Sequence, residues 1–96
     1  MVRSTARVAT DQPERYIKQL VSHLAHKLTT RLEDDGRGSI GFESGRCVLA
    51  AEPGSLVLVA TADDDAALEH VRGVVTRHLE RFGGRAGLEV NWNETV

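Results

Sequence analysis

The fold of this chain is decided by residues 46–60, which read RCVLAAEPGSLVLVA. Two apolar runs with strand-like composition flank a break that contains Pro53 and Gly54. Successive side chains of a strand point to opposite faces of a sheet, and a Pro-Gly pair between two such runs is typical of a turn. The stretch therefore predicts two antiparallel strands joined by a short turn.

The same alternation of strands and turns continues on both sides of this stretch. Residues 29–32 and 39–43 read as a hairpin around the turn-forming residues 34–38. Alternating polar and apolar residues also predict a first strand at 3–9 and a closing strand at 88–92. Four of these strands follow one another as a meander, and pairing of the first with the last would hold the termini.

Two helices interrupt the strands. Residues 12–27 carry an apolar stripe at helical spacing and follow Thr10 and Asp11, with Glu14 in the register of a capping box. The stripe consists of Ile17, Leu20, Val21, Leu24 and Leu28. Three aspartates at 63–65 begin a second helix, whose apolar positions are Leu68, Val71, Val75, Leu79 and Phe82 and which residues 83–84, both glycine, should end.

These elements predict one α+β domain over residues 1–96, in the order β-α-β-β-β-β-α-β. Two helices with one apolar face each and six short strands most simply form a two-layer sandwich. We therefore expect a mostly antiparallel sheet of about five or six strands, with both helices on one face.

Composition limits the classes of function. The chain is 41% hydrophobic and 27% charged, which is typical of an ordered domain, and its net charge of −2 argues against nucleic-acid binding. The first half, residues 1–48, is the more basic, with eight Arg and Lys against six Asp and Glu. Cys47 is the single cysteine, which rules out an intramolecular disulfide. No signal sequence and no membrane-spanning run is apparent, so we expect a cytoplasmic protein without a membrane partner.

The most functional-looking side chains lie along one flank of the first helix. At about 100° per residue, the polar residues beside the apolar stripe are Tyr16, Gln19, His23, His26 and Lys27. Imidazoles, an ammonium group and a phenol on one surface could bind an anion or a metal. The stripe is complete without them, so they are free for a ligand.

A metal site is the sharper form of this hypothesis. His23 and His26 lie three residues apart on the predicted helix, so both could reach one ion. A structural zinc needs about four protein ligands and a catalytic zinc about three, and only Cys47 and His78 could add to the pair. The plainer alternative is a hydrogen-bonded His23 and a solvated His26. No cofactor is required by the sequence.

His78 and Cys47 have structural interpretations that outweigh catalytic ones. His78 falls within the apolar arc of the second helix and is predicted to be a partly buried, hydrogen-bonded packing residue, whereas His70 points away from that arc to the surface. Cys47 belongs to a predicted strand in apolar company. A small hydrolase or transferase would need Cys47 to meet His23 or His78 in a pocket.

Several motifs in one order resemble a small bacterial family known as domain of unknown function 2218. The motifs occupy residues 4–10, 15–20, 23–27, 45–47, 78–82 and 88–92. The resemblance implies no established activity; it favours a link to iron, because some relatives are encoded near iron and siderophore genes. The chain departs from the family pattern at 83–87, GGRAG, where relatives carry bulkier and acidic residues.

The sequence thus favours a non-enzymatic cytoplasmic binding or accessory domain. Its working surface would be the flank of the first helix, and its ligand a metal or a small anionic iron chelate. A protein-interaction module that forms a homodimer through an edge strand is the alternative, and the Cys/His enzyme is a third. The decisive geometry is whether His23, His78 and Cys47 converge, or whether His23 and Lys27 line an open groove.

Overall fold

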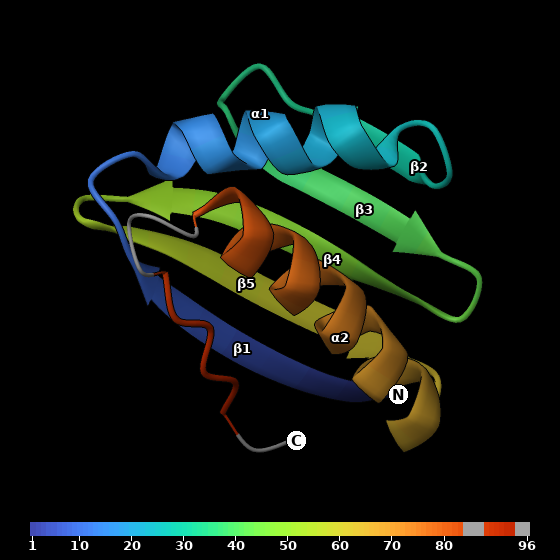
Figure 1. Ribbon diagram of the computed structural model, residues 1–96. Helices are drawn as coiled ribbons and strands as arrows, with labels where there is room; N and C mark the ends of the chain where they lie inside the picture. Colours follow the sequence, from blue (N-terminus) through green and yellow to red (C-terminus); the bar gives the residue numbers. More distant parts are fainter. Residues whose placement is uncertain (84–87, 94–96) are drawn as a thin grey trace.

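The computed structural model describes residues 1–83 and 88–93 of the chain, which form two helices and one antiparallel sheet (Figure 1). The elements are, in chain order, β1 (Val2–Ala9), α1 (Pro13–Leu24), β2 (Thr29–Leu32), β3 (Gly38–Phe42), β4 (Gly45–Glu52), β5 (Ser55–Ala62) and α2 (Asp65–Phe82).

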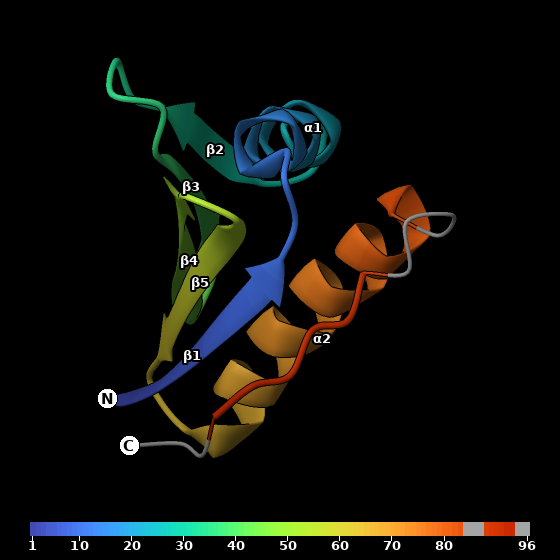
Figure 2. The same cartoon turned by 90° about the vertical axis from the view of Figure 1, so that its left-hand side faces the viewer.

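The sheet contains five strands in the order β1-β5-β4-β3-β2. Strands β2 to β5 form the predicted meander, and β1 returns to pair with β5, where Val8 lies opposite Leu56. Both helices cover the same face of the sheet (Figure 2). The predicted two-layer α+β sandwich and its order of elements are confirmed.

The core lies between the sheet and the two helices. Alternation along β4 turns Cys47 and Leu49 toward the helices, where both are fully buried. Val48, between them, faces the other side of the sheet, where it is half-buried opposite Val59. The helices contribute the buried residues Pro13, Ile17, Leu20, Leu24, Leu68, Val71, Val75 and Leu79.

The first helix is shorter than predicted at its C-terminal end. It ends at Leu24, and the backbone N–H of Leu28 donates to the Leu24 carbonyl at 2.8 Å, which closes a turn through residues 25–27. Thr29 then begins β2 opposite Gly41, so pairing with the sheet takes over from helix propagation. His26 and Lys27 therefore lie in a turn, and the prediction of a helix through residue 27 was wrong.

The predicted capping box of α1 does not form either. Gln12 is the N-cap residue and makes no side-chain cap, while the hydroxyl of Thr10 accepts a hydrogen bond from the Gln12 N–H at 3.1 Å. Pro13, the first helical residue, has no N–H to satisfy, so the first turn has one fewer donor that needs a cap.

The boundaries of α2 follow the prediction more closely. The carboxylate of Asp64 accepts a hydrogen bond from the Ala67 N–H at 2.8 Å, as an acidic N-cap should. At the other end the Gly83 N–H donates to the Leu79 carbonyl at 2.9 Å. Gly84, the second predicted stop residue, and the rest of the divergent segment 84–87 lie outside the described residues.

The predicted closing strand is reduced to a single bridge. Trp92 pairs with Ala6 of β1 in antiparallel fashion, and the Asn93 N–H donates to the Thr5 carbonyl at 2.8 Å. Ser4 donates its hydroxyl hydrogen to the Asn93 carbonyl at 2.6 Å. The expected pairing between the first and last segments is therefore present, but over two residues instead of five. Within the described residues, neither helix is long and apolar enough to cross a bilayer.

Candidate functional site

A groove opens where the C-terminal end of α1 faces the middle of α2. It has a volume of about 260 Å³, and we call it the histidine groove. Its polar lining residues are His23, Lys27, His70 and His78, and its apolar ones are Leu24, Leu28, Phe42 and Val74. None of these eight side chains is acidic, so the groove presents only neutral or positively charged groups to a ligand.

Two imidazoles from different helices meet in this groove. The ring centroids of His23 and His78 are 5.1 Å apart, with a tilt of 56° between the planes. The ring of Phe82 stands edge-on to His23 at 5.4 Å. His23 is exposed and His78 is half-buried, so the pair is open to solvent on the α1 side.

One nitrogen of His78 is already engaged. Its Nδ1 lies 2.7 Å from the carbonyl oxygen of Val74, one helical turn earlier. A carbonyl oxygen only accepts, so Nδ1 carries the hydrogen, and a neutral His78 has its lone pair on Nε2. The prediction of a partly buried, hydrogen-bonded His78 is correct, and Nε2 remains for a ligand.

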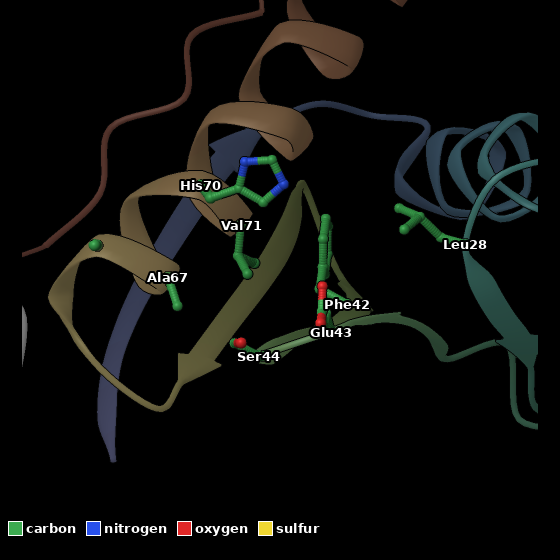
Figure 3. A pocket seen from close by; sticks show the side chains of 9 residues that line it. Leu28, Phe42, Glu43, Ser44, Ala67, His70 and Val71 are labelled. Carbon is green, nitrogen blue, oxygen red and sulfur yellow. The ribbon is translucent and has the colours of Figure 1, made fainter.

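A second cavity adjoins the histidine groove along α2. It has a volume of about 450 Å³ and shares Leu28, Phe42 and His70 with the groove (Figure 3). The ring of Phe42 meets that of His70 edge-on at 5.9 Å, at the junction of the two spaces. The other lining residues of the second cavity are Glu43, Ser44, Gly45, Ala66, Ala67 and Val71.

The structure divides the predicted flank of α1 into separate surfaces. His23 and Lys27 line the histidine groove, whereas His26 is exposed in the following turn and does not line it. Gln19 belongs to a shallow depression of about 480 Å³ together with Arg15, Lys18 and Ser22. Tyr16 is half-buried and packs against the core.

Cys47 does not join the histidines. It is fully buried in β4 between Ile40 and Ala60, and burial raises the pKa of its thiol to about 12. A thiol with that pKa stays protonated at neutral pH and is a poor nucleophile. The enzyme alternative needs Cys47 to meet a histidine in a pocket. His23 and His78 meet each other, but Cys47 lies inside the core.

The ligand set of a protein-bound metal ion is also incomplete. Among residues 1–83 and 88–93, no three or more His, Cys, Asp or Glu side chains are grouped as a metal ion requires. The partner of His23 is His78 on α2, not His26, and two imidazoles alone fall short of the usual three or four protein ligands.

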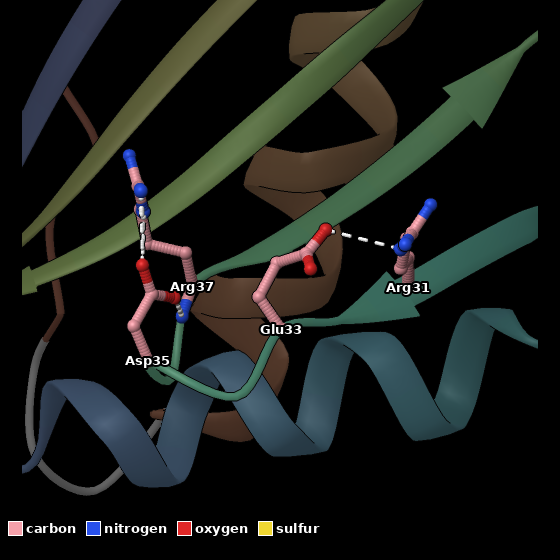
Figure 4. Close-up of polar contacts among 4 residues, drawn as sticks. All are labelled: Arg31, Glu33, Asp35 and Arg37. Atoms are coloured by element: carbon pink, nitrogen blue, oxygen red, sulfur yellow. Dashed lines mark hydrogen bonds and ion pairs between the residues drawn. The ribbon is translucent and has the colours of Figure 1, made fainter.

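Some of the basic residues near α1 are neutralised. Arg31 pairs with Glu33 at 3.0 Å and Arg37 with Asp35 at 2.9 Å, both beside the β2–β3 turn (Figure 4). Hydrogen bonds from the backbone and side chain of Arg37 lower the pKa of Asp35. These ion pairs lie at the turn and not in the groove. The lysine or arginine that lines the groove is Lys27.

Sequence reasoning missed Phe42, Val74 and His70 as members of the site. His70 is exposed, as predicted, yet it turns toward Phe42 at the junction. One signal was present: residues 70, 74 and 78 are spaced by four and share one face of a helix. The spacing alone did not indicate that this face of α2 meets the end of α1.

Comparison with known proteins identifies relatives but assigns no activity. The family model described as an uncharacterized protein conserved in bacteria, DUF2218, matches residues 5–93. The NMR structure of PA4090 from Pseudomonas aeruginosa is similar, with 34% sequence identity, a TM-score of 0.81 and coverage of 97% of this chain and 96% of that one. Among curated proteins, none matches the sequence.

Proposed function

Because the chain belongs to the bacterial family DUF2218, as its motifs predicted, and the description of that family names no activity, we propose a function from the geometry of the chain itself. The protein is a non-enzymatic, cytoplasmic binding domain that holds a small anionic ligand in the histidine groove. The observation that supports this function is the lining of the groove: Lys27 and three imidazoles surround an apolar floor, without a carboxylate. Ligand sites typically combine such an apolar wall with a few polar groups that fix orientation.

Each polar group has a distinct role in this proposal. Lys27 supplies the permanent positive charge, and its exposed side chain can change conformation to contact the ligand. His23 and His78 donate N–H groups once they are protonated, and His78 is held in place by its bond to the Val74 carbonyl. Hydrogen bonds between charged partners are about twice as strong as neutral ones.

A small anionic metal chelate, including an iron chelate, is a narrower candidate for the same groove. A chelate supplies most of the ligands of its own metal, so it needs only one or two from the protein. The supporting observation is that the His78 Nδ1–H is taken by a carbonyl, which leaves Nε2 as a donor to a metal. His23, 5.1 Å away between ring centroids, would be the second donor.

The test is a titration of the protein with butyrate and with ferric citrate, in which binding is measured by calorimetry and by NMR shifts of backbone amides. His23→Ala and Lys27→Ala should each weaken binding, by about tenfold for a lost charged hydrogen bond. His26→Ala is the matched control, because that histidine is exposed outside the groove. Loss of binding in His26→Ala, or unchanged binding in His23→Ala and Lys27→Ala, would contradict the proposal.

The pH dependence separates the two kinds of ligand. Affinity for a simple anion should rise on acidification, because protonated imidazoles add positive charge to the groove. Affinity for a chelate held through metal–imidazole bonds should fall, because protonation removes the donor lone pairs.

A homodimer through an edge strand is the second candidate. The described part of the chain covers the outer edge of β1 with Trp92 and Asn93, but leaves the outer edge of β2 without a neighbouring strand. Leu32 of this edge strand is 44% exposed and, with Met1, is one of the two large apolar side chains that the described residues expose. Sedimentation should detect a dimer that Leu32→Lys dissociates. A monomeric wild type over the whole concentration range would eliminate this candidate.

A further inference from the structure

We infer that the ligand of the histidine groove is an unbranched medium-chain carboxylate whose alkyl chain continues into the second cavity. This inference rests on the proposed function and specifies its ligand class. The head group would lie among His23, Lys27 and His78, and the chain would run along α2 toward Ala67.

Continuity of the two spaces is the first argument. Leu28, Phe42 and His70 line both of them, so the groove of about 260 Å³ and the cavity of about 450 Å³ meet at these three side chains. Figure 3 shows the Phe42 side chain between Leu28 on one side and Ala67 and Val71 on the other. An alkyl chain that crosses the junction would lie against apolar atoms along its length.

The change in chemistry along α2 is the second argument. Positively charged and imidazole groups gather at the His78 end, whereas Ala66, Ala67 and Val71 line the far end. Glu43 also stands at the far end, next to Ser44, whose carbonyl accepts the Asp63 N–H at 2.9 Å near the start of α2. A carboxylate is attracted to the first end and repelled from the second, which gives the ligand one orientation.

The distance along α2 sets the length of the chain. From Ala67 to His78 the helix rises about 16 Å at 1.5 Å per residue. A two-carbon or four-carbon acid fills only the histidine groove, and only the longest medium-chain acids, such as decanoate, come near the alanines. The small side chains of Ala66 and Ala67 leave room there that larger residues would take.

The test is the affinity of the wild-type protein for butyrate, hexanoate, octanoate and decanoate, all well below the concentrations at which they form micelles. Each added methylene that reaches apolar surface should raise affinity by about threefold to fourfold. The gain should end when the second cavity is full. Octanol, which has the chain without the charge, should bind more weakly than octanoate, and Lys27→Ala should weaken octanoate but not octanol.

Blocking variants locate the chain. Ala67→Phe should remove the gain from octanoate to decanoate and leave butyrate affinity unchanged, since Ala67 does not line the histidine groove. Ala66→Phe, at an exposed position that lines the same cavity, repeats the test if the first variant unfolds. Glu69→Phe is the control for an added aromatic ring on α2, because Glu69 is exposed and lines neither space.

The outcomes distinguish this inference from the function on which it rests. Equal affinity for butyrate and octanoate would overturn the medium-chain ligand and leave anion binding intact. A gain from octanoate to decanoate that persists in both Ala67→Phe and Ala66→Phe would place the chain elsewhere and also overturn it. If butyrate, octanoate and ferric citrate all fail to bind, the proposed function fails as well.

Discussion

Gly45 approaches Thr61 so closely across the β4–β5 pair that a Cβ atom on residue 45 would lie 2.5 Å from the Thr61 carbonyl oxygen. The Thr61 oxygen belongs to the backbone, so rotation of a side chain cannot relieve the clash. The start of β4 thus lies close against the end of β5, directly beside the second cavity that Gly45 helps to line.

Gly45→Ala should therefore destabilise the protein by about 1–3 kcal/mol, the usual cost of overpacking. Gly41→Ala is the matched control, because a Cβ there would meet its nearest neighbour, the Thr29 carbonyl oxygen, at an ordinary 3.5 Å. Both changes restrict the unfolded chain equally. Urea unfolding should show a lower midpoint for Gly45→Ala alone, and equal midpoints for the two variants would refute the contact.

Leu20→Ala should cost about 2–5 kcal/mol by leaving a cavity under α1. Leu20 is fully buried and does not line the histidine groove, so the variant tests helix packing separately from binding. Gln19→Ala, at the neighbouring exposed position, should change stability by less than about 0.5 kcal/mol. A small loss in Leu20→Ala would show that the apolar stripe does not pack against the sheet.

Cys47 should react slowly with a thiol reagent in the native protein and rapidly after unfolding in urea. The pKa of the thiol is raised from 9.0 to about 12 by burial, so the folded state holds the proton more tightly than the unfolded state. The stabilisation linked to this proton is complete below pH 9 and is lost as the pH rises toward 12. Wild-type stability should thus fall more steeply above pH 9 than that of Cys47→Ala; rapid native-state alkylation would contradict the buried position.

The bond from the indole of Trp92 to the hydroxyl of Thr76, at 2.8 Å, should couple the last described segment to α2. A double-mutant cycle of Trp92→Phe and Thr76→Val, followed by circular dichroism in urea, should give a coupling free energy of about 0.5–1.5 kcal/mol. Additive losses would show that the two side chains do not interact in solution.

The ion pair of Asp35 and Arg37 should have only a small effect, because both side chains are more than half exposed. The pKa of Asp35 is lowered, chiefly by hydrogen bonds from Arg37, so its contribution to stability is present at neutral pH and is lost as the pH falls through the acid range. Acid titration of Asp35→Asn should lack this part of the decline. High salt should diminish the difference between the two proteins.

The sheet and the helical stripes could be predicted because their signals are local. The alternation at Cys47 and Leu49 and the spacing of Leu20 and Leu24 each report which face of one element is buried. The end of α1 could not be read this way, since residues 25–27 leave the helix in a turn that brings Thr29 opposite Gly41, a partner set by the sheet. The length of the closing strand was overestimated for the same reason, because its pairing with β1 is also set by the sheet.

The site was predicted only in part, because it joins surfaces whose relative position depends on how two helices dock. His23 and Lys27 were identified from the polar flank of α1. The approach of His23 to His78 and the junction between Phe42 and His70 are tertiary contacts between elements distant in the chain. Tyr16 and Gln19 share the helical flank with His23 but have other surroundings, and His26 lies exposed in the turn that follows the helix.

The pairing of β1 with β5 has a consequence for how the chain acquires its structure. The hairpins from β2 to β5 connect neighbouring segments, so each can form early. Strand β1, in contrast, can pair only with the distant β5, where Val2 lies opposite Ala62. On the ribosome β1 therefore emerges long before its partner and remains an unpaired strand during synthesis. We expect the β2–β5 meander to form the folding nucleus, with β1 and the Trp92 segment added last as the rate-limiting long-range closure.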